Sequence, residues 1–346
     1  MVVAVVVLIA TYSISRVKPA LDLPQNWLIA ACDVGQGDST FIRSGTNSAV
    51  LVDVGPSKMN TGGETTGNCA SKLGIETIDE LQISHYHDDH IGGLKAFLAR
   101  FKVRKAVLNP VKQPESEWSN VVKLLEKYNV PIEYSTEGRT GEFGCESGSE
   151  ALGPASDLVG SATGIGPATS AGKGVTSAYS GGASQYCAKY EVLSIWDNLS
   201  KAGELVDDGK ATASKGTKTA AEDDRENNSS EVVEFVVNGV SYWTAGDLET
   251  NGGKGALKKM QAKGLGSVDV VKVNHHGSKT QDKQLEQLLS PKLALYMVGK
   301  NTYGHPNQQT VDDFEKLGAT SLRTDLNGVC GVYLDDEGQL RSFSER

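Results

Sequence analysis

Short apolar runs separated by polar turns recur along the chain from Trp27 almost to its end. Most have the length and β-branched content of buried strands, and segments with helical periodicity separate several of them. The pattern therefore predicts an α/β protein with strands in both halves. Strands are expected at residues 28–34, 39–42, 49–54, 81–85, 103–108, 190–196, 231–237, 240–245, 268–274, 293–298, near 322, 329–334 and 340–343, and helices at 91–101, 119–128, 254–263, 282–289 and 309–317.

One long interruption, from Gly138 to Arg225, is rich in Gly, Ala, Ser and Thr and poor in large apolar residues. Such a composition cannot bury enough apolar surface to order itself as a domain. Because the strand-like run Tyr190–Trp196 lies inside it, we expect two flexible, low-complexity insertions, at about 138–188 and 198–225. Both would interrupt a single domain that covers residues 27–346.

The segment at residues 1–20 begins with a nearly continuous aliphatic run, Met1–Ala10. The run is shorter than a membrane span and lacks the charged start of a secretory signal. It is typical of the second half of a transmembrane helix, while a signal anchor or a buried first strand would also fit. Arg16 and Lys18, just after it, would favour a cytoplasmic remainder by the positive-inside tendency.

The 346 residues, 38% of them apolar and 22% charged, suffice for one large core or two modest ones. A net charge of −9 argues against general binding of nucleic acids, although Lys and Arg gather between Lys95 and Lys127. That stretch would line a local basic groove or, alternatively, form an ordinary solvated helix face.

The five cysteines contain no C-x-x-C pair, so their spacing does not indicate a compartment. Cys145 and Cys187 flank the first expected insertion and could form a disulfide. Cys32 and Cys330 lie in apolar strand-like runs and are expected to be buried thiols.

Three of the six histidines lie within six residues, in the sequence Ser84-His85-Tyr86-His87-Asp88-Asp89-His90. This H-x-H-x-D-H spacing, between a predicted strand and a predicted helix, is that of a binuclear metal site. His85 and His87 can bind one ion while Asp89 and His90 turn toward a second, a mixed nitrogen and oxygen set that suits Zn²⁺ and tolerates Mn²⁺ or Fe²⁺. Hydrolysis by a metal-activated water is therefore the leading hypothesis, and a polar surface loop is the alternative.

Two strand ends in the second half of the chain offer further ligands. Asp247 follows one predicted strand on a Gly-Asp step, and His275 and His276 follow another. Each feature alone is common, since a strand-terminal Asp usually forms a turn and a single His is usually satisfied by hydrogen bonds. Their order after the histidine cluster makes them candidates for the same site.

With these motifs the chain resembles the metallo-β-lactamase-fold hydrolases, and among them the extracellular hydrolase-like domains of the ComEC family of DNA-uptake channel proteins. The resemblance implies a metallo-β-lactamase-like αββα sandwich, membrane-associated on the extracellular face or secreted, next to the membrane channel portion of a DNA-uptake protein. It rests on Cys32-Asp33-Val34-Gly35-Gln36-Gly37-Asp38, Leu51-Val52-Asp53-Val54-Gly55, the histidine cluster, Asn227-Asn228-Ser229-Ser230, Thr244-Ala245-Gly246-Asp247, His275-His276-Gly277-Ser278 and Asn301-Thr302-Tyr303-Gly304-His305-Pro306.

The resemblance also implies a ligand set for two divalent ions, Zn²⁺ or Mn²⁺. Site one would take His85 and His87, site two would take Asp89 and His90, and Asp247 would bridge both ions. His276 is the better match for the last ligand, which leaves His275 as an outer contact or proton donor.

Further residues would support the reaction. Asp89 would orient the attacking water as well as bind metal, and His305 would donate a proton or contact a phosphate, unless it is a structural turn residue. The loop residues expected to align the ligating imidazoles are Asp33, Gln36, Asp38 and Asp53.

One position departs from the wider superfamily. Related hydrolases carry a histidine before the hairpin that leads to the Gly-Asp step, where this chain has Asn227-Asn228-Ser229. An amide oxygen from Asn228 or Asn227 is a poorer Zn²⁺ ligand than imidazole, so site one should hold its ion more weakly.

The resulting hypothesis is a monomeric metal-dependent hydrolase, a phosphodiesterase that cleaves single-stranded DNA during DNA uptake. One alternative is a hydrolase of another ester. The other is a DNA-guiding domain of an uptake channel whose metal site is vestigial, which the missing histidine would favour.

Overall fold

The computed structural model describes residues 23–57, 63–145, 186–195 and 225–346. The aliphatic start and most of the two expected insertions therefore lie outside the described residues. Among the helices of the described ranges, none has the length and apolar content needed to cross a membrane.

The first sheet, within the described residues, has nine strands in the order β16-β15-β1-β2-β3-β4-β6-β7, with β5 also paired to β4. Strands β3, β4, β6 and β7 run parallel to one another, and the remaining neighbours on the path are antiparallel. The strands are β1 (Trp27–Ala31), β2 (Thr40–Arg43), β3 (Ser48–Val52), β4 (Thr77–Ile83), β5 (Lys102–Val103), β6 (Ala106–Leu108), β7 (Ile132–Tyr134), β15 (Cys330–Leu334) and β16 (Leu340–Ser344).

The second sheet has the order β14-β13-β12-β11-β10-β9-β8 in the described part of the chain. Strands β11 to β14 are parallel, and β8 to β11 are antiparallel. The strands are β8 (Thr140–Phe143), β9 (Ala188–Ser194), β10 (Val232–Val237), β11 (Val240–Thr244), β12 (Val270–Lys272), β13 (Leu293–Tyr296) and β14 (Thr320–Arg323).

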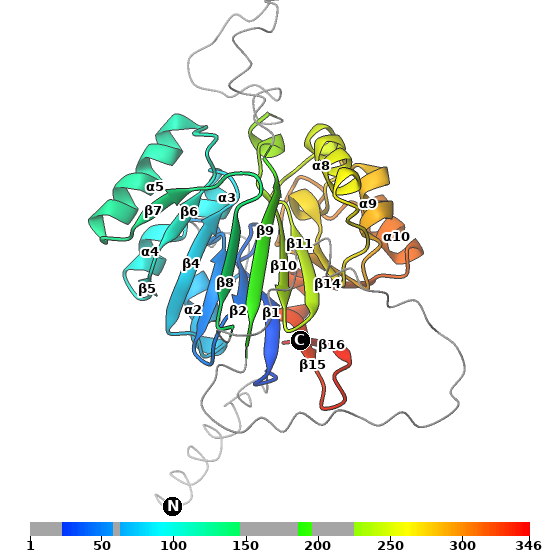
Figure 1. Ribbon diagram of the computed structural model, residues 1–346, viewed down its shortest axis with the longest axis horizontal. Coiled ribbons are helices and arrows are strands. Elements are labelled where there is room, and N and C mark those ends of the chain that lie inside the picture. The colour runs from blue at the N-terminus through cyan, green and yellow to red at the C-terminus, as the bar shows by residue number, and fades with distance from the viewer. Residues whose placement is uncertain (1–22, 58–62, 146–185, 196–224) are drawn as a thin grey trace, which may run out of the picture.

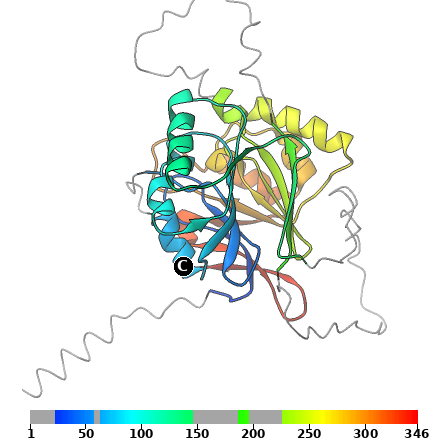
Figure 2. The same cartoon turned by 60° about the vertical axis from the view of Figure 1, so that its left-hand side comes forward.

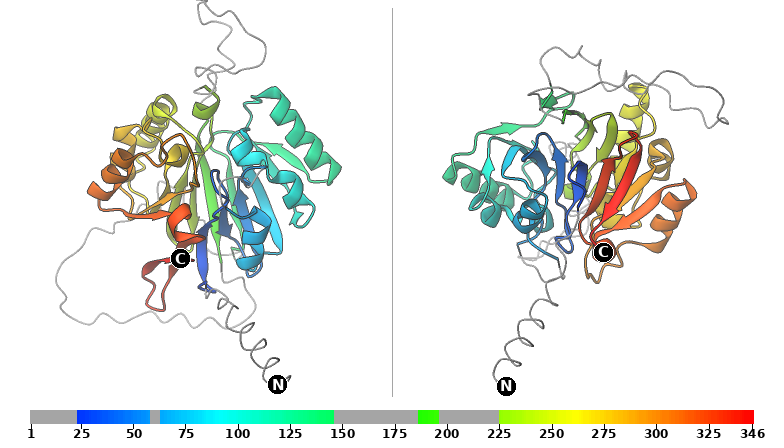
Figure 3. Two further views of the ribbon diagram at one scale, coloured as in Figure 1. Left: turned by 180° about the vertical axis from the view of Figure 1, so that it is seen from behind. Right: turned by 90° about the horizontal axis from the view of Figure 1, so that it is seen from below.

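The two sheets face each other and helices cover their outer faces, as Figure 1 and the turned view in Figure 2 show. This arrangement confirms the predicted αββα sandwich. The helices that cover the first sheet are α2 (Thr66–Lys72), α4 (Leu94–Leu98) and α5 (Glu115–Lys127), and those that cover the second are α8 (Thr250–Ala262), α9 (Lys283–Leu289) and α10 (Gln308–Lys316) (Figure 3). The short elements that follow strand ends are α3 (Asp88–Ile91), α11 (Thr324–Asn327) and the 3₁₀ turn η2 (Asn274–Gly277).

Alternation along the strands explains the layers, because successive side chains of a strand point to opposite faces. In β3, Leu51 packs under the helices while Val50 and Val52 face the other sheet. In β11, Tyr242 points between the sheets and Trp243 points toward the helices of the second layer. The described residues therefore form three apolar cores, one between the sheets and one beneath each helical layer.

Most predicted elements are present within a few residues of their expected bounds, with several differences. The single helix expected at 91–101 is divided into α3 and α4, since the chain passes through Gly92-Gly93. The strand expected at 103–108 is divided into β5 and β6, and helices α2 and α11 and strand β7 lie where no element was predicted. Strand β8 occupies the expected start of the first insertion, so the expected boundary at residue 138 is too early.

Two disulfides are present. Cys145–Cys187 joins the end of β8 to the start of β9, as the sequence suggested. Cys32–Cys69 ties the end of β1 to α2, so the expectation that Cys32 is a free thiol is wrong. The reason is tertiary, because the unpredicted helix α2 brings Cys69 against β1. Cys330 is buried and unpaired, as expected.

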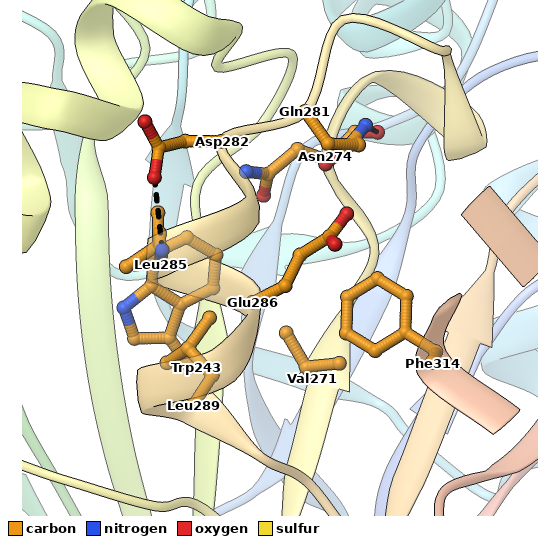
Figure 4. Close-up of a pocket in the computed structure, with 9 residues that line it drawn as sticks. All are labelled: Trp243, Val271, Asn274, Gln281, Asp282, Leu285, Glu286, Leu289 and Phe314. Carbon is orange, nitrogen blue, oxygen red and sulfur yellow. Dashed lines mark hydrogen bonds between the residues drawn. The ribbon is translucent and has the colours of Figure 1, made fainter. Parts of the chain in front are cut away.

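A small pocket lies between the second sheet and helices α9 and α10 (Figure 4). Its wall is largely apolar and surrounds the carboxyl group of Glu286. None of the candidate metal ligands lines it, so it belongs to the helix–sheet packing rather than to the histidine cluster. The lining residues are Trp243, Val271, Asn274, Gln281, Asp282, Leu285, Glu286, Leu289 and Phe314.

Candidate metal centre

The histidine cluster lies in the turn that leaves β4. The strand ends at Ile83, and the chain then passes through His85 to His87, which is the N-cap residue of α3. The short helix α3 carries Asp89 and His90. Since parallel strands place their carboxyl ends at one edge of a sheet, residues that follow β3, β4 and β6 meet at this edge.

The second sheet contributes further candidate ligands at the same edge. Asp247 follows β11, and His276 lies in η2 after β12, where both His275 and His276 have positive φ angles of 46° and 51°. His276 Nε2 lies 3.0 Å from Asp89 Oδ2, a contact that joins the two halves of the chain. The sandwich thus brings together motifs that are far apart in sequence.

Four side chains form a compact donor group: Asp89, His90, Asp247 and His276 have ligand atoms within 4.8 Å of one another. Asp247 Oδ1 lies 3.2 Å from His90 Nε2, and Asp247 Oδ2 lies 3.4 Å from His276 Nε2. Ligands around one tetrahedral ion are about 3.4 Å apart when the bonds are ~2.0–2.2 Å long. The spacing and the mixed nitrogen and oxygen donors therefore fit a divalent transition metal.

His85 adds a second sign of a metal site. Its side chain is buried, and its Nε2 atom has no hydrogen-bond partner among the described residues. A buried imidazole nitrogen left unpaired costs free energy that a bound cation would remove. Burial, with His90 and His87 nearby, also holds the pKa of His85 well below its usual value, so the ring is neutral and able to ligate.

Outer contacts orient the imidazoles. His90 Nδ1 lies 2.8 Å from Asp53 Oδ2, and His276 Nδ1 lies 2.7 Å from the carbonyl oxygen of Met297 and 3.2 Å from Asp38 Oδ1. These contacts engage Nδ1 and leave Nε2 for the centre of the site, the usual arrangement of metal-binding histidines. Asp38 and Asp53 are thus in contact with imidazole nitrogens of His276 and His90, respectively. Asp53 also accepts from the Ser84 backbone and hydroxyl groups.

Asp33 and Gln36 make different contacts from those expected. Asp33 pairs with the guanidinium of Arg346 near the end of the chain, and Gln36 accepts at 3.4 Å from the backbone of Gly299. These contacts therefore support the loops around the site rather than the imidazoles.

A buried lysine that was not predicted as a site residue lies beneath the centre. Lys272 is 0% exposed, and its Nζ lies 2.5 Å from Asp38 Oδ2, 2.5 Å from Gly246 O and 3.5 Å from Asp247 Oδ1. Burial lowers the pKa of Lys272, but Asp38 and Asp247 outweigh it and raise that pKa above the usual value. The sequence feature that could have identified Lys272 is its position as the single charged residue of the apolar strand-like run at 270–273. A lysine is rarely buried without carboxylate partners, so such a position indicates a buried ion pair.

Related hydrolases carry a histidine near residues 227–229, and in this chain the carboxylate of Glu226, just before that segment, lies next to His87. Glu226 Oε2 lies 2.7 Å from His87 Nε2, and Glu226 is buried. Asn228 Oδ1 instead accepts from the backbone of Gly252 at 2.6 Å and of Glu249 at 3.3 Å, at the start of α8. The geometry therefore favours Glu226 over Asn228 as the oxygen donor of site one.

His275 and His305 lie at the rim. His275 Nδ1 is 2.9 Å from Glu249 Oε1, and its Nε2 is 3.7 Å from Asp247 Oδ2. The His305 ring centroid is 5.0 Å from that of His275 and 6.4 Å from that of His276. Burial and the two neighbouring histidines lower the pKa of His305 to about 4.

The basic stretch at 95–127 is partly neutralised. Arg104 lies 2.7 Å from Asp79, and Lys105 lies 2.8 Å from Glu80, both acids of β4. Lys112 lies over the rings of Trp118 and Tyr134, 4.8 Å from each. This stretch therefore presents less free positive charge than its composition suggested.

The sequence of the chain is similar to those of known proteins. The sequence profile of the metallo-beta-lactamase superfamily matches residues 32–157. The chain is 26% identical over 315 residues to ComE operon protein 3 of Bacillus subtilis (strain 168), and the match covers 86% of this chain and 32% of that protein. The chain thus spans about a third of the length of that curated relative.

Similar solved structures include CmlA, a diiron beta-hydroxylase from Streptomyces venezuelae, with 14% identity, a TM-score of 0.47, and coverage of 93% of this chain and 55% of that one. Zn²⁺-bound PqqB from Methylobacterium extorquens has 10% identity, a TM-score of 0.45 and coverage of 87% of both chains.

Proposed function

Because the chain has the metallo-β-lactamase fold and resembles ComE operon protein 3 over most of its length, we propose that it is a metal-dependent phosphodiesterase acting on single-stranded DNA. The main observation in support of a hydrolase is the donor group of Asp89, His90, Asp247 and His276. It lies next to His85, whose buried Nε2 atom has no hydrogen-bond partner among the described residues. The DNA substrate and the neighbouring membrane channel follow from the resemblance alone.

Two groups of side chains would hold two metal ions. When bound, a pair of divalent ions would activate water near neutral pH and offset the charge of a phosphate group. Site two would be held by Asp89, His90 and His276, site one by His85, His87 and Glu226, and Asp247 would connect them.

Residues at the centre and the rim of the site would orient water and transfer protons. The carboxylate of Asp89, half-buried beside His276, would orient the nucleophilic water. His275, held by Glu249, would donate a proton to the leaving oxygen or bind the phosphate, and His305, whose low pKa leaves its ring neutral near pH 7, would contact the phosphate.

The decisive experiment combines metal content with cleavage. The full chain, loaded with Zn²⁺ or Mn²⁺, should retain one to two ions in native mass spectrometry and cleave an end-labelled single-stranded oligonucleotide. Asp247→Ala should lose bound metal and reduce cleavage by more than about 100-fold, because it removes a ligand and not an outer contact. Glu226→Gln should lower the occupancy of one ion and leave the other, while Asp336→Ala, an exposed acid on the β15–β16 turn, is the matched control.

The outcomes separate the alternatives. Absence of bound metal after loading would overturn the hydrolase proposal, and equal cleavage by wild type and Asp247→Ala would assign the activity to a contaminant. A metal-loaded protein that binds single-stranded DNA in a salt-dependent way without cleaving it would favour the DNA-guiding domain. Cleavage of small phosphate esters without any action on DNA would favour a hydrolase of another ester.

A further inference from the structure

The loop after β13 presents an exposed aromatic ring beside the candidate metal centre. Tyr303 is 75% exposed, and Leu326, at 61%, is the other large apolar side chain so exposed in the described part of the chain. A single exposed tyrosine is ordinary on a protein surface. Tyr303 differs because its loop is held in one conformation and its ring adjoins the site.

Asn301 holds the loop. Its Oδ1 accepts from the backbone N–H groups of Tyr303, Gly304 and His305 at 3.0, 3.0 and 3.1 Å. Its Nδ2 donates to the carbonyl oxygens of Gly299 at 2.9 Å and His305 at 2.7 Å. Gly304 has a φ of +79°, which favours glycine there. The backbone that carries Tyr303 is therefore held by hydrogen bonds. A ligand that packs on the ring would lose little conformational entropy of this loop on binding.

A row of rings leads from Tyr303 into the site. The Tyr303 and His305 ring centroids are 5.9 Å apart with planes at 36°, and His305 in turn lies 5.0 Å from His275 and 6.4 Å from His276. His276 Nε2 is one of the four clustered donor atoms. The Tyr303 ring therefore lies at the outer end of a row of rings whose inner end is at the candidate metal centre.

We propose that Tyr303 is a stacking subsite for the nucleobase next to the phosphate that is cleaved. This inference rests on the proposed function and deepens it, because a base offers a free face for stacking only when it is unpaired. The subsite would therefore favour single strands over duplexes with little preference among bases, as stacking platforms do. His305 lies between the ring and the metal centre and would bound the subsite on its inner side.

The test uses the full metal-loaded chain and fluorescently labelled phosphorothioate oligothymidylate, which resists cleavage, with an abasic oligonucleotide of equal length as the reference probe. Wild type should bind the base-containing probe more tightly than the abasic one, and Tyr303→Ala should lose about 5- to 150-fold of that preference. Tyr303→Phe should keep it. Leu326→Ala, which removes the other exposed apolar side chain, is the control and should behave as wild type.

Two readouts separate stacking from a structural role and from the proposed function. Since the Tyr303 side chain is largely in water, Tyr303→Ala should melt at the wild-type temperature. Equal base preference in Tyr303→Ala and wild type, or no preference in wild type, would overturn the stacking subsite even if the DNA were cleaved. A base preference that depends on Tyr303 in a protein that never cleaves DNA would retain Tyr303 as a base-stacking contact and refute the phosphodiesterase.

Discussion

Replacing Lys272 with Met should destabilise the metal-free protein strongly, although the new side chain has a similar length and is apolar. The ammonium group is completely buried and contacts Asp38, Gly246 O and Asp247. Its removal leaves the buried Asp38 carboxylate without its nearest cation. Breaking a buried ion pair from one side costs about 3–5 kcal/mol, so we expect a loss of about 4 kcal/mol in the free energy of unfolding.

Urea unfolding in the presence of a chelator measures this loss, with Lys258→Met as the control because Lys258 is exposed on α8. The control should stay within about 0.5 kcal/mol of wild type. Lys272→Met/Asp38→Asn should recover about 2 kcal/mol or more relative to the sum of the single variants, because the neutral amide removes the orphaned charge. A loss below about 1 kcal/mol for Lys272→Met, or strictly additive effects in the double variant, would refute the view that Lys272 is the counter-charge of Asp38.

Two further predictions concern stability. The double variant Cys32→Ala/Cys69→Ala should lower the free energy of unfolding by about 4 kcal/mol in chemical denaturation, because the bond closes a loop with a sequence separation of 37; no change relative to wild type would mean that the bond is absent in solution. Burial raises the pKa of Glu231 to about 8, with Glu80 adding to the rise and the Ser135 hydroxyl opposing it. The native state then binds more protons than the unfolded state between about pH 4.5 and 8, so this residue lowers stability as the pH rises through that window. Glu231→Gln should therefore exceed wild type in stability at pH 9, by on the order of 3 kcal/mol, and by less at pH 5; equal effects at both pH values would contradict this reasoning.

Features that depend on neighbours along the chain could be predicted from the sequence. The alternation of Val50, Leu51 and Val52 places β3 between two cores, and the His85–His90 spacing places several metal-ligand types within one turn. Strand ends supplied Asp247 and His276 as candidates, since a polar residue after an apolar run is visible without a structure. The fold class and the compact donor group were therefore within reach of local patterns and a family resemblance.

The tertiary structure decided which distant groups meet, because chain proximity in space depends on how the two sheets pack and not on any local pattern. Glu226 rather than Asn228 faces His87 since the start of α8 takes the Asn228 oxygen. Helix α2, too short and weakly patterned to be predicted, brought Cys69 to Cys32. In the sequence, Lys272 is a single charged residue within an apolar strand. It becomes part of the site because β12 packs against the loops that carry Asp38 and Asp247.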